Sequence, residues 1–202
     1  MDLLIGTTNP GKLREYAALF DGLPARLLSL HDVGLGSMDV EEPFETFEEN
    51  ARHKAAEYAR QSGLLALADD TGLVVDALDG RPGVYSKRYA GPGKTDADRC
   101  QVILGELAAV PVERRTARFV CVLAAVSADG AINETAYGAV EGQIGYTPGT
   151  GNQGFGYDAI FIPDGYGVPR SDISFAEKNN LSHRGAAARA LLPTLRRILE
   201  IN

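Results

Sequence analysis

Short apolar runs alternate along this chain with segments in which apolar residues recur every three or four positions. The runs are typical of buried strands, and the spaced pattern is typical of helices with one buried face. We therefore expect strands at residues 2–6, 25–30, 64–68, 73–78 and 159–162. We expect helices at residues 12–21, 46–61, 95–110 and 182–200. Pro193 lies inside the last helical segment and predicts a kink or a break there.

Local signals place two helix ends and add a hairpin. Thr46 is followed three residues later by Glu49, which predicts a capping box at the start of the second helix, and Gly63 is a C-terminal stop signal. Residues 117–128 and 131–140 are joined by a short turn and predict two long strands in a hairpin. Because strands and helices alternate before this hairpin, the sequence predicts a mixed α/β sheet in one domain.

The composition is that of a globular domain without a membrane span. The chain has 202 residues, of which 45% are hydrophobic, and no apolar stretch reaches the roughly 18 to 20 residues that cross a bilayer. The first residues do not resemble a secretory signal, and Cys100 and Cys121 lack metal or redox spacing, so we expect a cytoplasmic location. The formal charge of −7 argues against nucleic acid or an anionic membrane as a partner, but not against a small anionic ligand.

A polar turn joins the first predicted strand to the first helix, and it consists of Thr7, Thr8, Asn9, Pro10, Gly11 and Lys12. Such a turn places free backbone N–H groups and the positive end of a helix dipole at one point, which favours phosphate, and Lys12 adds a charge. The spacing is not that of a Walker A loop. By pattern alone, an ordinary strand–helix turn is the simpler explanation.

A second polar segment leads into the second helix. Asn50 and Lys54 lie four positions apart, so they share a helix face and can reach one common target, and Glu42 lies just upstream. A solvated acidic helix face is the alternative interpretation, because charge runs usually are solvated faces.

A third segment places Asp69 and Asp70 directly after the apolar run 64–68. Burial of a lone carboxylate is costly unless a positive or hydrogen-bonding partner meets it. Ligands of open α/β sheets bind in loops at the carboxyl ends of strands, and two carboxylates there suit Mg²⁺. The alternative is that one Asp caps a turn while the other is solvated.

Two further polar segments lie in the C-terminal part of the chain. Phe155 and Tyr157 stand between glycines and are suited either to stacking on a planar base or to the core. Lys178, His183 and Arg184 lie at or near a helix start, where positive charge opposes the helix dipole. That local cost favours an anionic or electron-rich partner.

The chain resembles the inosine/xanthosine triphosphate pyrophosphatase family from Thr7 to about Leu192. The resemblance rests on five motifs in order, TTNPGK, TFEENARHKA, ADDTGLVVDALDGRPGVYSKRYAG, GFGYDAIF and SHRGAA. It implies an elongated mixed sheet flanked by helices, with two lobes around a central cleft, and a homodimer. It also implies Mg²⁺-dependent hydrolysis of ITP, dITP and XTP to the nucleoside monophosphate and pyrophosphate.

The resemblance further implies roles for individual positions. Glu42, Asp69 and Asp70 would form the metal site. Asp70 would also accept the proton of the attacking water, and Lys54 would act beside it on the phosphates. Substrate contacts would come from Thr7, Thr8, Asn9, Pro10, Gly11, Lys12, Thr71, Phe155, Gly156, Tyr157, Asp158, Lys178, His183 and Arg184.

Departures from the family pattern are small. Thr71 stands where members generally carry Ser, Ala159 replaces a frequent Pro, and Thr8 replaces a common Gly. None of these changes removes a charged group. Two alternatives stay open: a nucleotide diphosphatase for pyrimidine or other modified nucleotides, and a nucleotide-binding protein without catalysis.

Two mechanistic hypotheses follow. An Asp70 carboxylate close to a cation is a weak base, so it would orient a metal-polarised water at least as much as deprotonate it. Arg184 and His183 would donate hydrogen bonds to O6 of a 6-oxo purine, where adenine instead presents a donor.

Overall fold

The computed structural model describes residues 1–151, 154–174, 177–178 and 181–201. Six strands form one sheet in the order β2-β1-β3-β4-β5-β6. The strands are β1 (Asp2–Ile5), β2 (Arg26–Ser29), β3 (Leu65–Val75), β4 (Thr116–Val126), β5 (Asn133–Ile144) and β6 (Phe161–Pro163). The helices are α1 (Pro10–Leu19), α2 (Phe47–Ser62), α3 (Asp96–Glu106) and α5 (His183–Ile201), with 3₁₀ turns η1 (Asp76–Leu78), η2 (Gly83–Arg88), η3 (Val112–Arg114) and η4 (Arg170–Asp172).

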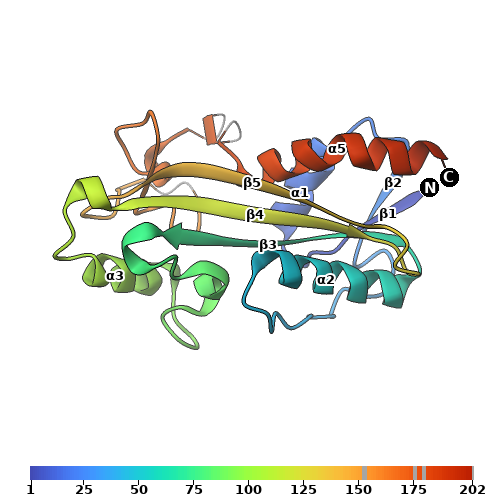
Figure 1. Ribbon diagram of the computed structural model, residues 1–202, viewed down its shortest axis with the longest axis horizontal. Coiled ribbons are helices and arrows are strands. Elements are labelled where there is room, and N and C mark those ends of the chain that lie inside the picture. The colour runs from blue at the N-terminus through green and yellow to red at the C-terminus, as the bar shows by residue number, and fades with distance from the viewer. Residues whose placement is uncertain (152–153, 175–176, 179–180, 202) are drawn as a thin grey trace. The chain divides into compact units, whose positions relative to one another are not determined.

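The sheet mixes parallel and antiparallel pairs. β1 pairs in parallel with both β2 and β3, whereas β6 pairs with β5 in the antiparallel sense. The predicted mixed α/β class is therefore confirmed (Figure 1).

Residue contacts divide the chain into two compact units. Unit 1 comprises Met1–Asp70, Cys121–Gly138 and Arg184–Asn202, and unit 2 comprises Thr71–Val120 and Ala139–His183. The division falls within β3, β4 and β5, so each of these strands contributes residues to both units.

Alternating side chains of the strands bury both faces of the sheet in unit 1. Leu67 and Leu123 belong to a cluster that includes residues of α1 and α5. Ala66 and Ala124, each adjacent to one of these leucines, belong to a second cluster with α2. This alternation is the period of two that a strand buried on both faces requires. Figure 1 accordingly shows α5 on one side of the unit 1 strands and α2 on the other.

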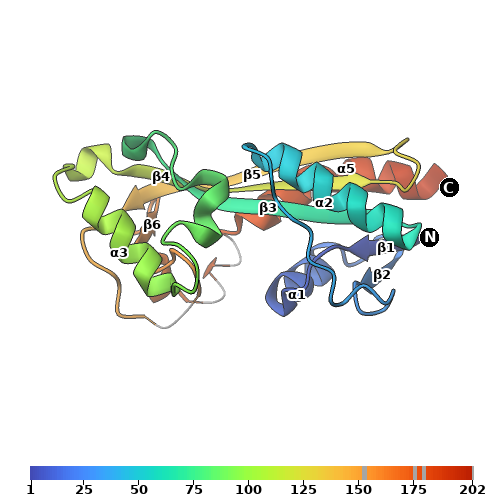
Figure 2. The same ribbon diagram turned by 90° about the horizontal axis from the view of Figure 1, so that it is seen from below.

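Unit 2 has its own apolar cluster. Leu73 and Phe119 from the strands pack there with Ile103 of α3 and with Tyr157 and Phe161. Figure 2 shows α3 beside β6 and the segment that leads into it. This packing brings the predicted GFGYD motif against the N-terminal half of α3.

A buried arginine closes the end of α3. Arg115 is 1% exposed and donates hydrogen bonds to the carbonyl oxygens of Leu107 (2.6 Å), Gly145 (2.7 Å) and Val110 (2.9 Å). The guanidinium thus satisfies carbonyls at the C-terminal end of a helix, where the dipole also favours a cation. No sequence pattern distinguished this arginine from its neighbours.

Two predicted strands are one in the structure. β3 runs from Leu65 to Val75 straight through Asp69 and Asp70, so the predicted interruption at the acidic pair is wrong. The reason is that both carboxylates are buried and both have polar partners within the fold. The segment Asp76–Leu78, predicted as the end of the second strand, is the 3₁₀ turn η1.

Other predicted ends are close to the observed ones. Thr46 caps α2, and Gly63 ends it in a left-handed conformation with φ +73°, as predicted. A kink or a break was predicted at Pro193; α5 continues through this residue, so there is no break, and the kink stays a prediction. Residues 152–153 of the glycine-rich segment lie outside the described residues. Within the described ranges, no helix is long and apolar enough to cross a membrane.

Candidate active site

Asn9 organises the turn before α1. Its Oδ1 accepts hydrogen bonds from the backbone N–H groups of Gly11 (2.8 Å) and Lys12 (3.2 Å), and Pro10 stands at the start of the helix. The N–H of Asn9 itself donates to Oγ1 of Thr7 at 3.2 Å. The expectation that free N–H groups line this turn is therefore wrong for Gly11 and Lys12, whose donors serve the cap.

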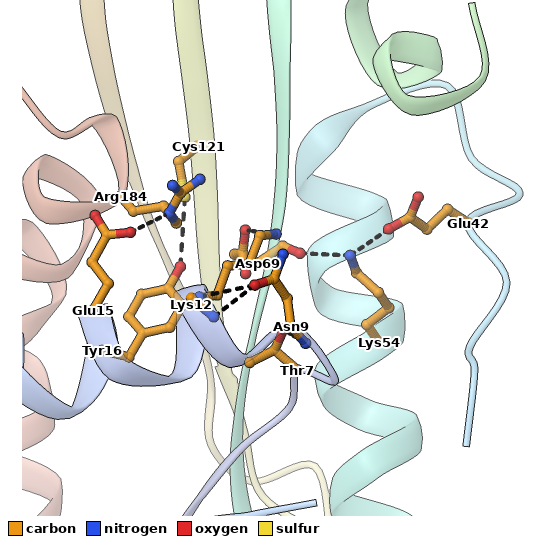
Figure 3. A network of polar contacts seen from close by, with 11 residues as sticks. Thr7, Asn9, Lys12, Glu15, Tyr16, Glu42, Lys54, Asp69, Cys121 and Arg184 are labelled. Atoms are coloured by element: carbon orange, nitrogen blue, oxygen red, sulfur yellow. Dashed lines mark hydrogen bonds and ion pairs between the residues drawn. The ribbon is translucent and has the colours of Figure 1, made fainter. Parts of the chain in front are cut away.

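Lysine side chains from two helices reach Asp69 in β3. Lys12 of α1 donates from Nζ to Asp69 Oδ2 at 2.7 Å, and Lys54 of α2 donates to the backbone oxygen of Asp69 at 2.5 Å (Figure 3). Burial opposes the charged form of Asp69, but the attraction of Lys12, Lys54 and Arg184 outweighs it and holds the pKa of this carboxyl well below its usual value. The positive partner that the buried Asp69 carboxylate requires is thus the ammonium group of Lys12.

Lys54 lies among all three carboxylates that were predicted to bind a metal. Its Nζ donates to Glu42 Oε1 at 2.5 Å as well as to the Asp69 backbone. Burial would lower the pKa of Lys54, but Asp69, Glu42 and Asp70 together raise it above the usual value. The ammonium therefore stays charged throughout the neutral range.

Asn50 holds Asp70. The Asn50 side chain donates to Asp70 Oδ2 at 3.1 Å and exchanges two hydrogen bonds with the backbone of Phe44. Asn50 and Lys54 were expected to reach one common target; they instead contact adjacent residues of β3, Asp70 and the backbone of Asp69. An amide carries no net charge, so this contact orients the Asp70 carboxylate without neutralising it.

Within the part of the chain that the structure describes, the predicted metal site offers fewer than three grouped ligands. Among the described residues, no three His, Cys, Asp or Glu side chains are grouped so that they could hold a metal ion, so Glu42, Asp69 and Asp70 do not form one such cluster. Mg²⁺ usually takes one or two carboxylates and completes its shell with water and phosphate oxygens. The negative charges of Glu42 and Asp70 both act on Lys54, and these two carboxylates match the one or two that Mg²⁺ usually takes.

Arg184 also belongs to the polar network of unit 1. Its Nε donates to Glu15 Oε2 at 2.7 Å, and its side chain is buried (Figure 3). Burial opposes the charge, but Glu15 and Asp69 raise the pKa of Arg184 further above its already high value. The neighbouring Tyr16 hydroxyl lies 3.9 Å from the sulfur of Cys121, and burial raises the pKa of this tyrosine strongly.

The GFGYD residues lie in unit 2. Phe155 is 59% exposed, whereas Tyr157 is buried and donates from its hydroxyl to the Ser86 backbone oxygen at 2.8 Å. Phe155 therefore lies at the surface, and Tyr157 serves the core. Stacking of Phe155 on a base stays a prediction.

A buried ion cluster follows this motif. Asp158 accepts from Arg170 at 2.6 Å and from Lys178 at 3.0 Å, and all three side chains are buried. The backbone N–H of Phe155 donates to the same carboxylate at 3.2 Å. Asp158 thus links two predicted substrate-binding residues, because it contacts both the backbone of Phe155 and the side chain of Lys178.

The remaining predicted residues are placed as follows. His183 is buried in unit 2, where its ring stacks on Phe119 at a centroid distance of 5.2 Å. Thr71 is half-buried in β3, directly after Asp70, and Thr8 is exposed. Although His183 and Arg184 are adjacent in sequence, His183 stacks on Phe119 of β4, whereas Arg184 donates to Glu15 of α1.

Several polar partners were missed in the sequence. Glu15 and Arg170 are ordinary surface-type residues in the pattern, and only their contacts with Arg184 and Asp158 give them a place near the predicted site residues. Asp96 lies in the first turn of the helix expected at residues 95–110 and was not singled out, yet its Oδ2 accepts the backbone N–H of Gly156 at 2.7 Å. No local sequence pattern reveals such a contact, because Asp96 and Gly156 are far apart in the sequence.

The Lys12–Asp69 ion pair predicts a pH-dependent stability. Because the folded-state pKa of Asp69 is depressed, its stabilisation is present above the unfolded-state pKa of about 4 and is lost as the pH falls below that value. Lys12→Met removes one cation, so we expect it to lower the free energy of unfolding at pH 7 by about 1–4 kcal/mol, and by less at pH 3. Urea unfolding at both pH values measures this.

The exposed Lys94 supplies the control for that experiment. Lys94→Met should change the free energy of unfolding by less than about 0.5 kcal/mol at either pH. Equal destabilisation by the two variants at pH 7 would contradict the role assigned to the Lys12–Asp69 pair.

Comparison with known proteins places this arrangement in a family. A sequence model of the Ham1 family matches residues 3–194. A protein of Geobacter sulfurreducens named dITP/XTP pyrophosphatase is 50% identical over 186 residues, which cover 92% of each chain. A Bacillus cereus protein of the same name is 43% identical over 194 residues, covering 94% of this chain and 92% of the relative.

Solved structures agree with the sequence comparison. A HAM1 protein from Coxiella burnetii superposes with a TM-score of 0.88 at 36% identity over the whole of both chains. A nucleoside-triphosphatase / dITP/XTP pyrophosphatase from Mycobacterium abscessus gives a TM-score of 0.78 at 40% identity, covering 96% of this chain and 100% of the other. The resemblance that the five motifs indicated is confirmed, and the chain belongs to the Ham1 family.

Proposed function

We propose that this chain is a nucleoside triphosphate pyrophosphatase that hydrolyses ITP, dITP and XTP to the nucleoside monophosphate and pyrophosphate. Relatives that are 41–50% identical over nearly the whole chain carry the name dITP/XTP pyrophosphatase. The structural observation that carries the proposal is the convergence of Lys12 and Lys54 on Asp69, next to Asp70. Two cations beside an amide-held carboxylate suit a triphosphate and an attacking water.

The proposed mechanism assigns separate tasks to the charges of unit 1. Lys12 and Lys54 balance the negative charge that develops on the leaving pyrophosphate. Asp70, held by the Asn50 amide, orients the water and accepts its proton. Asp69 keeps the two ammonium groups in place.

Magnesium is part of the proposal. Glu42 and Asp70 would hold Mg²⁺, which when bound neutralises phosphate oxygens and acidifies water. Glu42 accepts a hydrogen bond from Lys54 and Asp70 accepts one from Asn50, and these contacts would orient the two carboxylates for this role.

A substrate panel tests the function. We expect Mg²⁺-dependent release of pyrophosphate, not orthophosphate, from ITP, XTP and dITP, with much slower hydrolysis of GTP and ATP. EDTA should abolish the activity. Preferential hydrolysis of pyrimidine or other modified nucleotides would favour a different nucleotide diphosphatase, and nucleotide binding without hydrolysis would favour a non-catalytic protein.

The base preference is expected to depend on Arg184. Its buried guanidinium is a fixed donor, so Arg184→Ala should reduce the ratio of kcat/KM for ITP to that for ATP by on the order of tenfold to hundredfold. Steady-state kinetics on both nucleotides measure this ratio. Arg196, exposed on the same helix, provides the matched control Arg196→Ala, which should leave the ratio unchanged.

An unaltered ratio in Arg184→Ala would place base recognition elsewhere, with the backbone of the Phe155 loop as the next candidate.

We also propose a homodimer, as the resemblance implies. Light scattering of the purified protein measures its mass directly, and a monomer would refute this part of the proposal.

A further inference from the structure

One face of α3 binds both polar backbone groups of Gly156. Asp96 and Cys100 lie four positions apart on α3, so they share a helix face. The Asp96 carboxylate accepts the Gly156 N–H at 2.7 Å, and the Cys100 thiol lies 3.5 Å from the Gly156 carbonyl oxygen, which it meets as a donor. The helix therefore holds this glycine through a charge-assisted hydrogen bond and a weak one.

Gly156 separates an exposed aromatic ring from a buried one. Its φ of +65° lies in the left-handed region, which glycine adopts without strain. Phe155 before it is exposed, and Tyr157 after it is fixed in the core by the hydroxyl hydrogen bond to Ser86. The Gly156 N–H belongs to the peptide bond that joins this glycine to Phe155, so a hydrogen bond to it restrains the backbone that carries the Phe155 ring.

A cavity lies beside the Gly156 turn, so the Asp96–Gly156 hydrogen bond holds the turn on a side where packing is incomplete. A cavity of about 230 Å³ lies within unit 2, and its lining includes Asp96, Cys100, Phe155 and Gly156. A loop next to empty space can shift when a polar contact is removed, because less packing opposes the movement. The Asp158 carboxylate holds the other side of the loop through the Phe155 N–H.

We propose that Asp96 is a positioning residue for purine binding: its carboxylate fixes the Gly156 turn so that Phe155 presents its ring to the base. Asp96 acts through the loop and is not required to touch the substrate. This inference rests on the proposed function, because it concerns how the same site holds its nucleotide.

Three variants of α3 separate positioning from general stability. Asp96→Ala removes the acceptor of the Gly156 N–H, whereas Asp96→Asn keeps a neutral oxygen that can accept the same bond. Asp98→Ala is the matched control, because Asp98 is an acid of the same helix turn that forms its hydrogen bonds with Thr95. The control removes the capping box and lowers helix stability without breaking the contact with Gly156.

The kinetic result should be a selective rise in KM. Stacking of a base on an aromatic ring is worth about 1–3 kcal/mol, and partial loss of it in Asp96→Ala should raise KM for ITP on the order of tenfold. The turnover number kcat should change by less than about threefold, since the catalytic groups of unit 1 are untouched. Asp96→Asn should restore KM to within about threefold of the unmodified protein, and Asp98→Ala should leave KM unchanged.

Hydrogen exchange supplies a readout that does not depend on catalysis. The Gly156 amide should exchange on the order of tenfold faster in Asp96→Ala than in the unmodified protein or in Asp98→Ala. Faster exchange with an unchanged KM would overturn the inference, as would an equal rise in KM in Asp98→Ala. If the unmodified protein hydrolyses no nucleotide, the proposed function fails. The Kd for ITP measured by calorimetry then replaces KM, and Asp96→Ala is again expected to bind more weakly than Asp96→Asn and Asp98→Ala.

Discussion

Asp70→Asn is expected to lower kcat for ITP by about 10²- to 10⁴-fold while leaving the protein folded. The substitution removes the negative charge and the basicity of one carboxylate but retains its size. Asn50 donates to Asp70 Oδ2, and the side-chain oxygen of an asparagine can accept the same hydrogen bond. The local geometry of β3 should therefore persist, so the loss reports the chemistry of the carboxylate. Steady-state kinetics in saturating Mg²⁺, with a urea unfolding curve for each protein, measure the effect.

Asp76 supplies a matched control for this experiment. Its carboxylate is partly exposed in η1, directly after β3, and pairs with Arg118 in unit 2. Asp76→Asn removes one charge close to the same strand in sequence and should leave kcat within about twofold, because surface substitutions rarely act beyond their own contacts. A variant Asp70→Asn that is folded and keeps near-normal kcat would exclude Asp70 as the group that orients or deprotonates the water.

The sequence predicted the features whose causes are local. Thr46 and Gly63 mark the ends of α2 because a helix cap depends on residues within one turn of it. Helix geometry alone predicted that Asn50 and Lys54 point the same way, since residues four apart lie on one face, and both side chains reach β3. The five motifs in order were sufficient to indicate the family.

The errors arose where a distant partner decides the outcome. Asp69 and Asp70 interrupt an apolar pattern, so the strand was expected to end there, yet it continues because Lys12 and Asn50 meet the two carboxylates. Lys12 lies 57 residues away in sequence, and no period in the pattern reveals such a contact. A buried acid inside a strand is therefore a reason to look for a distant cation before a strand end is assigned.

The same reasoning explains the turn before α1. A polar strand–helix turn was expected to offer free N–H groups to phosphate, but Asn9 within that turn uses two of them as a cap. An Asn directly before Pro is itself a capping signal, so the residue that suggested phosphate binding also competes with it. The lysine side chains, more than the backbone of this turn, then carry the positive charge of the candidate site.

Lys54→Met is expected to reduce kcat/KM for ITP by on the order of 10²- to 10³-fold, comparable to removal of one preorganised donor from an active site. Methionine keeps much of the aliphatic stem, so the main change is the loss of an ammonium that contacts Glu42 and the Asp69 backbone. Without this cation, the carboxylates around it would repel a triphosphate instead of balancing its charge. Because these carboxylates raise the pKa of Lys54 above its usual value of 10.5, the group should stay protonated, and its loss of charge should not limit the activity of the unmodified protein below about pH 10.

Arg52 provides the control on the same helix, because it is also a cation of α2 but pairs with Glu48 and Thr135 outside the candidate site. Arg52→Met should leave kcat/KM within about twofold and lower stability by about 1 kcal/mol or less. Lys54→Arg keeps the charge on a larger, planar group, so it should recover only part of the activity. If a positive charge at position 54 is needed for the phosphates, kcat/KM should be highest in Arg52→Met, intermediate in Lys54→Arg and lowest in Lys54→Met. Equal kcat/KM for folded Lys54→Met and Arg52→Met would instead show that Lys54 only stabilises the buried acids, and catalysis would then have to draw its positive charge from Lys12.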